Sequence, residues 1–207
     1  MIRMVIATFL YQYNTQRILK VNEMKFIDLI KAKYLVAVVL MCTAGSSFAG
    51  SEAFKPGTQI KEFGKIASVD TTVVIPKDTK FKIVFDVATT GDAGTVNRKF
   101  DSLARFINMH VANGVKPENI DLALVVHGKA TLDVQNAASV EAKQLGENKN
   151  IPLLQSLLDN NVKIYLCGQS AAFYDVKTAD LYPGVDMALS AMTANALLQQ
   201  QGYTLNP

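Results

Sequence analysis

Cysteine and histidine are scarce in this sequence: its 207 residues contain two of each. A thioredoxin-like enzyme needs Cys-x-x-Cys, and Ser170 stands where the second cysteine would follow Cys167. The turn around Ser170 superficially resembles the serine elbow of an α/β-hydrolase. That class orders its triad serine, acid, histidine along the chain, whereas both histidines, His110 and His127, precede Ser170. Both enzyme classes are therefore excluded.

Long apolar runs and cofactor motifs are also missing. No stretch reaches the roughly 18 to 20 apolar residues of a membrane-spanning helix. The loop after the first predicted strand offers only Gly91-Asp-Ala-Gly94, which falls short of the G-x-G-x-x-G of a dinucleotide site. His110 lies on the apolar face of a predicted helix, where we expect it to pack and not to bind a metal. We expect neither a cofactor nor a metal site.

The first 49 residues have the pattern of an export signal. Three lysines within 25–33 form a positive segment, residues 34–41 form a short apolar segment, and Ser47-Phe-Ala49 has the small-x-small pattern of a cleavage site. We expect translation to start at Met24, which makes residues 1–23 an over-extended start. Cleavage after Ala49 would then release a periplasmic protein with no membrane span.

Removal of this leader changes the charge and the cysteine count. Residues 1–49 hold six of the 21 bases and two of the 18 acids, so the remainder carries 15 bases and 16 acids. No basic stripe remains, and nucleic-acid binding is excluded. Cys42 leaves with the leader; it does not indicate a lipoprotein, because Met41 stands where that processing needs a small residue. Cys167 is then either a thiol kept for its chemistry or intermolecular pairing, or a small buried hydrophobe.

Strand and helix patterns alternate along the rest of the chain. Residues 50–79 indicate an N-terminal arm, exposed over 50–68, with a short edge strand at 72–75. Further strands are predicted over 81–87, 121–126, 162–166, 185–191 and 203–205. Helices are predicted over 96–111, 133–146, a segment starting at Pro152, 170–174 and 193–201. This order predicts a single compact α/β domain over 80–207, with a mostly parallel sheet of about five strands and helices on both faces.

The carboxyl ends of parallel strands meet at one edge of a sheet, where ligands bind in such folds. His127 ends the second of these strands and Cys167 the third, so we predict both as catalytic residues, with His127 orienting or deprotonating Cys167. The alternative for His127 is that it only satisfies loop carbonyls. The short helix after Cys167 favours a thiolate over a thiol. The predicted binding residues flank these two: Gly128, Lys129, Gly168, Gln169 and Ser170. We expect the Ser170 hydroxyl to cap its own helix, and Asp86 to be solvated or paired across strands.

Three segments resemble the DsrE/DsrF-like family. Residues 162–172 are similar to its cysteine strand, loop and helix, 124–128 to its second strand and loop, and 185–207 to its last strand, helix and closing strand. The resemblance runs from about Lys80 to Pro207. It implies an α/β sandwich that commonly assembles into trimers or hexamers. In some members it also implies a persulfide on the cysteine that occupies the position of Cys167.

Two functions remain open. The first is an exported sulfur carrier or sulfurtransferase-like protein in which Cys167 accepts a persulfide from a donor protein or passes it to an acceptor. The second is a non-catalytic oligomeric module that binds a small ligand or a partner, with Cys167 structural. A reachable thiolate would favour the first function, and complete apolar burial of the thiol would favour the second.

Overall fold

The computed structural model describes residues 50–92, 94–143 and 145–206. The predicted leader, with its start at Met24 and its cleavage site after Ala49, lies outside these residues. Within the described part, no helix is both long and apolar enough to cross a membrane. Residues 50–207 form one unit of the chain.

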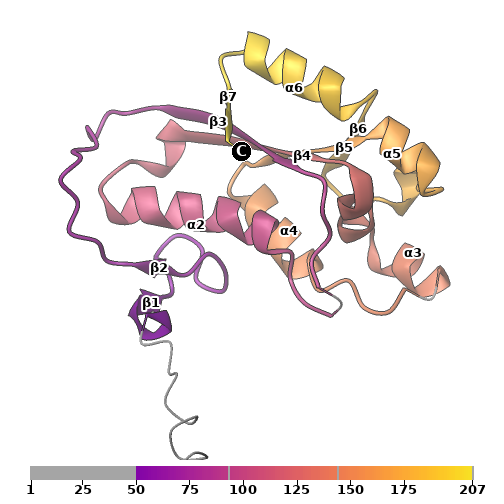
Figure 1. The fold of residues 1–207 in the computed structure, drawn as a ribbon, viewed down its shortest axis with the longest axis horizontal. Coiled ribbons are helices and arrows are strands. Elements are labelled where there is room, and N and C mark those ends of the chain that lie inside the picture. Colours follow the sequence, from indigo (N-terminus) through magenta and orange to yellow (C-terminus); the bar gives the residue numbers. More distant parts are fainter. Residues whose placement is uncertain (1–49, 93, 144, 207) are drawn as a thin grey trace, which may run out of the picture. The chain divides into compact units, whose positions relative to one another are not determined.

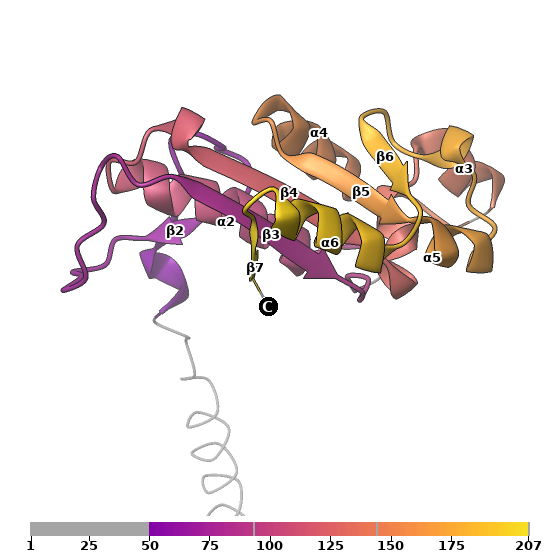
Figure 2. The same ribbon diagram turned by 90° about the horizontal axis from the view of Figure 1, so that it is seen from above.

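A five-stranded sheet lies at the centre of this unit, and all its strand pairs are parallel. Its order is β6-β5-β4-β3-β7, and Figure 2 shows the strands side by side. The strands are β3 (Phe81–Val87), β4 (Ile120–Val126), β5 (Lys163–Cys167), β6 (Val185–Ala188) and β7 (Thr204–Asn206). Their β-branched and apolar residues suit a pleated sheet that is covered on both sides. The predicted mostly parallel sheet of about five strands is confirmed.

Helices cover both faces of the sheet, as predicted (Figure 1). Helices α2 (Arg98–Ala112) and α4 (Ile151–Asp159) pack on one face, and α6 (Ala191–Gln200) packs on the other. The chain steps in one direction from β3 to β6 and then returns to β7 at the far edge. Because parallel crossovers are right-handed, this reversal of direction places α6 on the face opposite α2 and α4.

Two apolar layers hold the helices to the sheet. Phe85 and Val87 of β3 pack in the layer under α2 and α4, whereas Val84 of the same strand packs in the layer under α6. The predicted apolar face of α2 is present, since Phe100 and Leu103 are fully buried. Burying a side chain of this size stabilises the fold by about 1.5–3 kcal/mol. The two layers therefore hold the helices against both faces of the sheet.

The smaller helices differ in part from the sequence prediction. The predicted helix over 133–146 is replaced by a 3₁₀ helix, η3 (Gly128–Val134), and a short α3 (Ala137–Ala142). The Asn136 side chain accepts a hydrogen bond from the Ser139 N–H, so α3 starts only after this cap. The helix that follows Cys167, α5 (Gly168–Phe173), begins directly at the end of β5.

The N-terminal arm departs from its prediction at two places. The expected strand at 72–75 is absent, and Val73 and Val74 are 72% and 85% exposed. Pro76 follows them and has no N–H to donate to a strand partner. The segment 50–68 is not exposed throughout: β1 (Phe54–Lys55) pairs with β2 (Ile66–Ala67), and Ile60 between them is buried.

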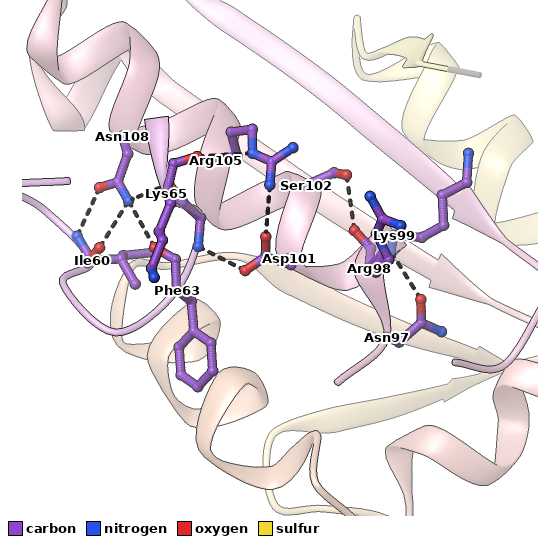
Figure 3. Close-up of polar contacts among 11 residues, drawn as sticks. Ile60, Phe63, Lys65, Asn97, Arg98, Lys99, Asp101, Ser102, Arg105 and Asn108 are labelled. Atoms are coloured by element: carbon purple, nitrogen blue, oxygen red, sulfur yellow. Dashed lines mark hydrogen bonds and ion pairs between the residues drawn. The ribbon is translucent and has the colours of Figure 1, made fainter. Parts of the chain in front are cut away.

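Asn108 of α2 anchors this arm (Figure 3). Its Nδ2 donates to the carbonyls of Ile60, Phe63 and Gly64 at 2.8, 3.0 and 3.1 Å, and its Oδ1 accepts from the Ile60 N–H at 2.9 Å. A Cβ on Gly64 would lie 2.2 Å from a backbone nitrogen of α2, so the close approach requires glycine. A helix side chain thus satisfies backbone groups that local sequence leaves unpaired.

Candidate functional site

Three adjacent strand ends contribute to one pocket at the carboxyl edge of the sheet. Asp86 of β3, His127 after β4 and Cys167 of β5 lie on the face that α6 covers. Residues at the start of α6 also line the pocket, whose volume is about 250 Å³. The lining residues are Asp86, His127, Cys167, Gln169, Ser190, Ala191, Met192 and Asn195. The structure thus brings together the two residues that the sequence analysis placed in a catalytic role.

Two glycines allow the backbone to turn tightly beside Cys167. A Cβ on Gly168 would lie 2.7 Å from the carbonyl oxygen of Ala188 in the neighbouring strand. Gly128 adopts φ +52°, and a Cβ there would lie 2.8 Å from the carbonyl oxygen of Ala88. Both approaches require a residue without a side chain. The predicted binding residues Gly128 and Gly168 therefore shape the site through the backbone.

Cys167 is nearly buried, at 6% exposed, yet four donor groups surround its sulfur. Burial raises the pKa of the thiol, but the polar groups around it, namely the Ser170 N–H, the Ser170 hydroxyl, the Ala191 N–H and the Gln169 N–H, together outweigh burial. The net result is a pKa below the ordinary value of cysteine. Two of these amides start α5 and one starts α6, so the first turns of two helices face the sulfur. This environment favours a thiolate.

Ser170 links the two strand-end loops. Its Oγ accepts a hydrogen bond from the Gly128 N–H at 3.0 Å, and the same hydroxyl is one of the groups that lower the pKa of the Cys167 thiol. The sequence analysis expected this hydroxyl to cap its own helix, but Cys167 occupies the N-cap position and no side chain caps α5 there. The hydroxyl instead binds the loop after β4 and lowers the pKa of the thiol.

His127 belongs to a second hydrogen-bonded group in the pocket. Its Nε2 lies 2.9 Å from Asp86 Oδ2, and Asn195 Nδ2 donates to Asp86 Oδ1 at 2.7 Å. With Asp86 as a carboxylate, both its oxygens accept, so the His127 proton lies on Nε2 and Nδ1 is left with a lone pair. Although His127 and Cys167 share the pocket, no hydrogen bond joins them within the described part of the chain. The groups that lower the pKa of the thiol are main-chain amides and Ser170, and the imidazole is not among them.

The remaining predicted binding residues, Gln169 and Lys129, differ in their relation to the pocket. Gln169 lines the pocket, and its Nε2 donates to the Leu189 carbonyl at 3.3 Å. Lys129 is exposed and does not line the pocket. His110 lies elsewhere, stacked on Phe106 with ring centroids 4.0 Å apart. The exclusion of Lys129 has a geometric cause, because Gly128 turns the chain away from the strand end before it.

Sequence reasoning missed Asn195 and undervalued Asp86. Asn195 lies in α6, one turn after Ala191 and beside Ala194 and Leu198, which are buried between this helix and the sheet. A polar residue so close to the buried stripe of a helix was the one sequence feature that could have indicated a site residue here. Asp86 lies two residues after Val84 in β3, so both side chains lie on the face that α6 covers. Asp86 pairs with His127 and also lines the pocket.

A separate buried polar group lies beside the loop after β3. Asp133 accepts hydrogen bonds from Thr90 Oγ1 at 2.7 Å, Asn97 Nδ2 at 2.7 Å and the Gly91 N–H at 3.3 Å. Burial raises the pKa of Asp133 and these bonds lower it, with a net rise. The group ties the loop, the cap of α2 and η3 together. Among the described residues, no cluster of three or more histidine, cysteine and acidic side chains suits a metal ion.

Comparison with known proteins identifies the family. The model of the DsrE/DsrF-like family matches residues 81–207. The chain belongs to this family. It resembles a solved protein of unknown function, MTH1491 from Methanobacterium thermoautotrophicum, with 13% identity and a TM-score of 0.48 over 61% of this chain and 98% of that one. It also resembles the YchN protein from E. coli, with 21% identity and a TM-score of 0.44 over 61% and 99%. No curated protein matches the chain.

Proposed function

We propose that this protein is a sulfur carrier in which Cys167 accepts sulfur as a persulfide. The observation that supports this most strongly is the set of four donors on the Cys167 sulfur, which lower its pKa at the wall of a pocket. A thiolate is the form of cysteine that attacks sulfur. Membership of the DsrE/DsrF-like family supports the same function.

The transfer uses a persulfide donor and no outside oxidant. The Cys167 thiolate attacks the outer sulfur of the donor, a new S–S bond forms to Cys167, and the bond between the two donor sulfurs breaks. The donor leaves as a thiolate, so one partner gains the sulfur that the other loses. The pocket of about 250 Å³ has room for the outer sulfur and the end of a small donor.

Mass spectrometry tests this function directly. The protein is purified from its native compartment without reductant, and a second sample is incubated with glutathione persulfide. We expect one added sulfur on the peptide that carries Cys167, removable by reductant and absent from the variant Cys167→Ser. A wild-type peptide that stays unmodified in both samples would contradict the proposal.

A partner-binding module is the second candidate function, with Cys167 structural. It is favoured by Leu189 and Met192, which are 72% and 79% exposed at the side of the pocket. Exposed apolar side chains of this size commonly mark contact surfaces. The two functions differ in thiol reactivity: rapid alkylation of folded protein favours the carrier, and resistance until unfolding favours the module.

We also propose that the protein is exported, is cut after Ala49, and works in the periplasm as a homo-oligomer, either a trimer or a hexamer. The leader pattern in residues 24–49 supports export, and the family resemblance supports assembly. N-terminal sequencing of the exported protein should begin at Gly50; a retained leader would contradict the processing. Light scattering should give a mass above that of one chain, and a concentration-independent monomer would contradict the assembly.

A further inference from the structure

We infer that Asp86 and Asn195 are positioning residues that hold His127 as the proton donor to the thiol released when Cys167 takes up sulfur. This inference rests on the proposed sulfur transfer. It assigns a role to a group of side chains that the formation of the Cys167 thiolate does not use.

The hydrogen bonds fix the imidazole from two further elements. Asp86 projects from β3 and Asn195 from α6, while His127 follows β4. Asp86 receives Asn195 Nδ2 on one oxygen at 2.7 Å and faces His127 Nε2 with the other at 2.9 Å. A carboxylate whose two oxygens are bound in this way has one orientation, and it selects one tautomer of the ring. The Nδ1 atom is therefore the one available for proton exchange.

The thiol does not need this imidazole. Its donors are three backbone amides and the Ser170 hydroxyl, and no hydrogen bond joins it to His127 among the residues that the structure describes. Both side chains nevertheless line the same pocket, and the His127 side chain is 31% exposed. The reaction partner that enters between them leaves as a thiolate, which requires a proton. The Nδ1 lone pair first takes a proton from solvent, and the imidazolium so formed gives that proton to the thiolate. Donor persulfide, Cys167 thiolate and imidazolium then become Cys167 persulfide, donor thiol and neutral imidazole.

Asn195 shows the signature of a residue placed for the site and not for stability. Its Oδ1 is buried and has no hydrogen-bond partner within the described chain, whereas its Nδ2 is bound to Asp86. Buried polar atoms are nearly always paired, so an unpaired one needs a reason. The reason here is that the same amide must present its nitrogen to the carboxylate. Replacement by alanine removes this unpaired oxygen together with the bond to Asp86, so it should change the stability of the fold little.

Three measurements on Asp86→Ala and Asn195→Ala test the inference. The first is the tautomer of His127, measured by ¹⁵N NMR; the resonances of His127 are those that disappear in the variant His127→Ala. The second is the rate of sulfur uptake from glutathione persulfide, and the third is the rate of alkylation by iodoacetamide. Iodide leaves without a proton, whereas the glutathione thiolate needs one. The matched control is Asp121→Ala, which removes an aspartate from the opposite end of the same sheet face, where it pairs with Lys163.

We expect the Nε2–H tautomer in the wild type and a mixture of tautomers in both variants. Uptake should fall about tenfold, at the low end of what general acids contribute. Alkylation should stay within about twofold of the wild type, because the donors of the thiol are unchanged. Asp121→Ala should change neither rate. If Asp86→Ala does not fold, Asp86→Asn keeps the shape and removes the carboxylate.

The inference and the proposed function fail in different ways. Wild-type protein that is alkylated but takes up no sulfur overturns the carrier function, and the proton-donor role with it. Wild-type uptake that neither variant slows, or a tautomer that neither variant changes, overturns the positioning role alone. An equal fall of uptake and alkylation also overturns it, since the residues would then act on the thiol itself.

Discussion

Ser170→Ala is the substitution that best tests how the surroundings of Cys167 lower the pKa of its thiol. It removes one of four donors to the Cys167 sulfur and also the acceptor of the Gly128 N–H. The three backbone amides stay, and so does burial, which is the largest single influence on the thiol and raises its pKa. We therefore expect the pKa of Cys167 to rise in this variant, toward or above the ordinary value of cysteine.

The size of the effect follows from the strength of one charge-assisted hydrogen bond. A hydrogen bond to a charged group contributes about 1.5–3 kcal/mol, and about 1.4 kcal/mol corresponds to a factor of ten in an equilibrium. Below its pKa, the thiol reacts in proportion to its thiolate fraction. Ser170→Ala should therefore lower the alkylation rate at about pH 6 by roughly tenfold or more, and should leave the limiting rate at high pH nearly unchanged.

The assay is the rate of iodoacetamide labelling as a function of pH. The matched control is Ser156→Ala, because Ser156 also lies in a helix and its hydroxyl donates only to the Pro152 carbonyl. A circular dichroism spectrum shows whether the loss of the Gly128 anchor disturbs the fold. An unchanged pH profile in a folded Ser170→Ala variant would refute the claim that this hydroxyl stabilises the thiolate.

The same bond predicts a change in stability with pH. A lowered pKa in the folded state means that ionised Cys167 contributes stability above the ordinary cysteine pKa, and that this contribution is lost as the pH falls through the folded value. Ser170→Ala should reduce the gain in stability between neutral and alkaline pH. Urea midpoints at both ends of that range measure it.

Three further predictions follow from the described contacts. His127→Ala should leave the alkylation profile of Cys167 close to that of the wild type, because no hydrogen bond joins the two residues in the described chain; a profile displaced as far as that of Ser170→Ala would contradict this. Asn108→Ala should destabilise the fold by about 3 kcal/mol, since a buried side chain with four hydrogen bonds is lost. It should also raise the rate of amide hydrogen exchange over 57–66. An unchanged rate there would contradict the role of Asn108 as the anchor of the arm. Burial raises the pKa of Asp133, so its contribution to stability is present below about pH 3.9 and is lost as the pH rises through the folded value. Urea midpoints of Asp133→Asn should therefore fall less than those of the wild type as the pH rises from about 4 to 6, and an equal fall would contradict the assignment.

The sheet could be predicted from the sequence because its signals are local. Residues 81–87 alternate and are rich in β-branched and aromatic residues, and β3 has the same bounds. The alternation of strands and helices then determined that the sheet is parallel and that its carboxyl edge carries the site. The arm could not be predicted in this way. Its burial depends on Asn108, whose hydrogen bonds join residues more than 40 positions apart in the chain.

Within the site, residue type and strand position located Cys167 and His127 but left their relation open. The face on which Asp86 lies depends on the phase of the strand relative to α6, which local patterns do not give. The role of Asn195 is harder still to predict from sequence, because its partner Asp86 lies 109 positions earlier in the chain. Long-range pairs of this kind carry no signal in one sequence.

The charge state of the thiol has the least sequence signal of all, because burial and main-chain amides largely determine it. Any residue supplies an N–H, so the identities of Gln169 and Ala191 reveal nothing about their bonds to sulfur. The only local traces are the glycine after Cys167, which permits the close approach to β6, and the hydroxyl of Ser170. A thiol activated in this way leaves the neighbouring histidine free to protonate the leaving thiolate. That division of labour is why His127 is assigned here to the leaving thiol and not to the attacking one.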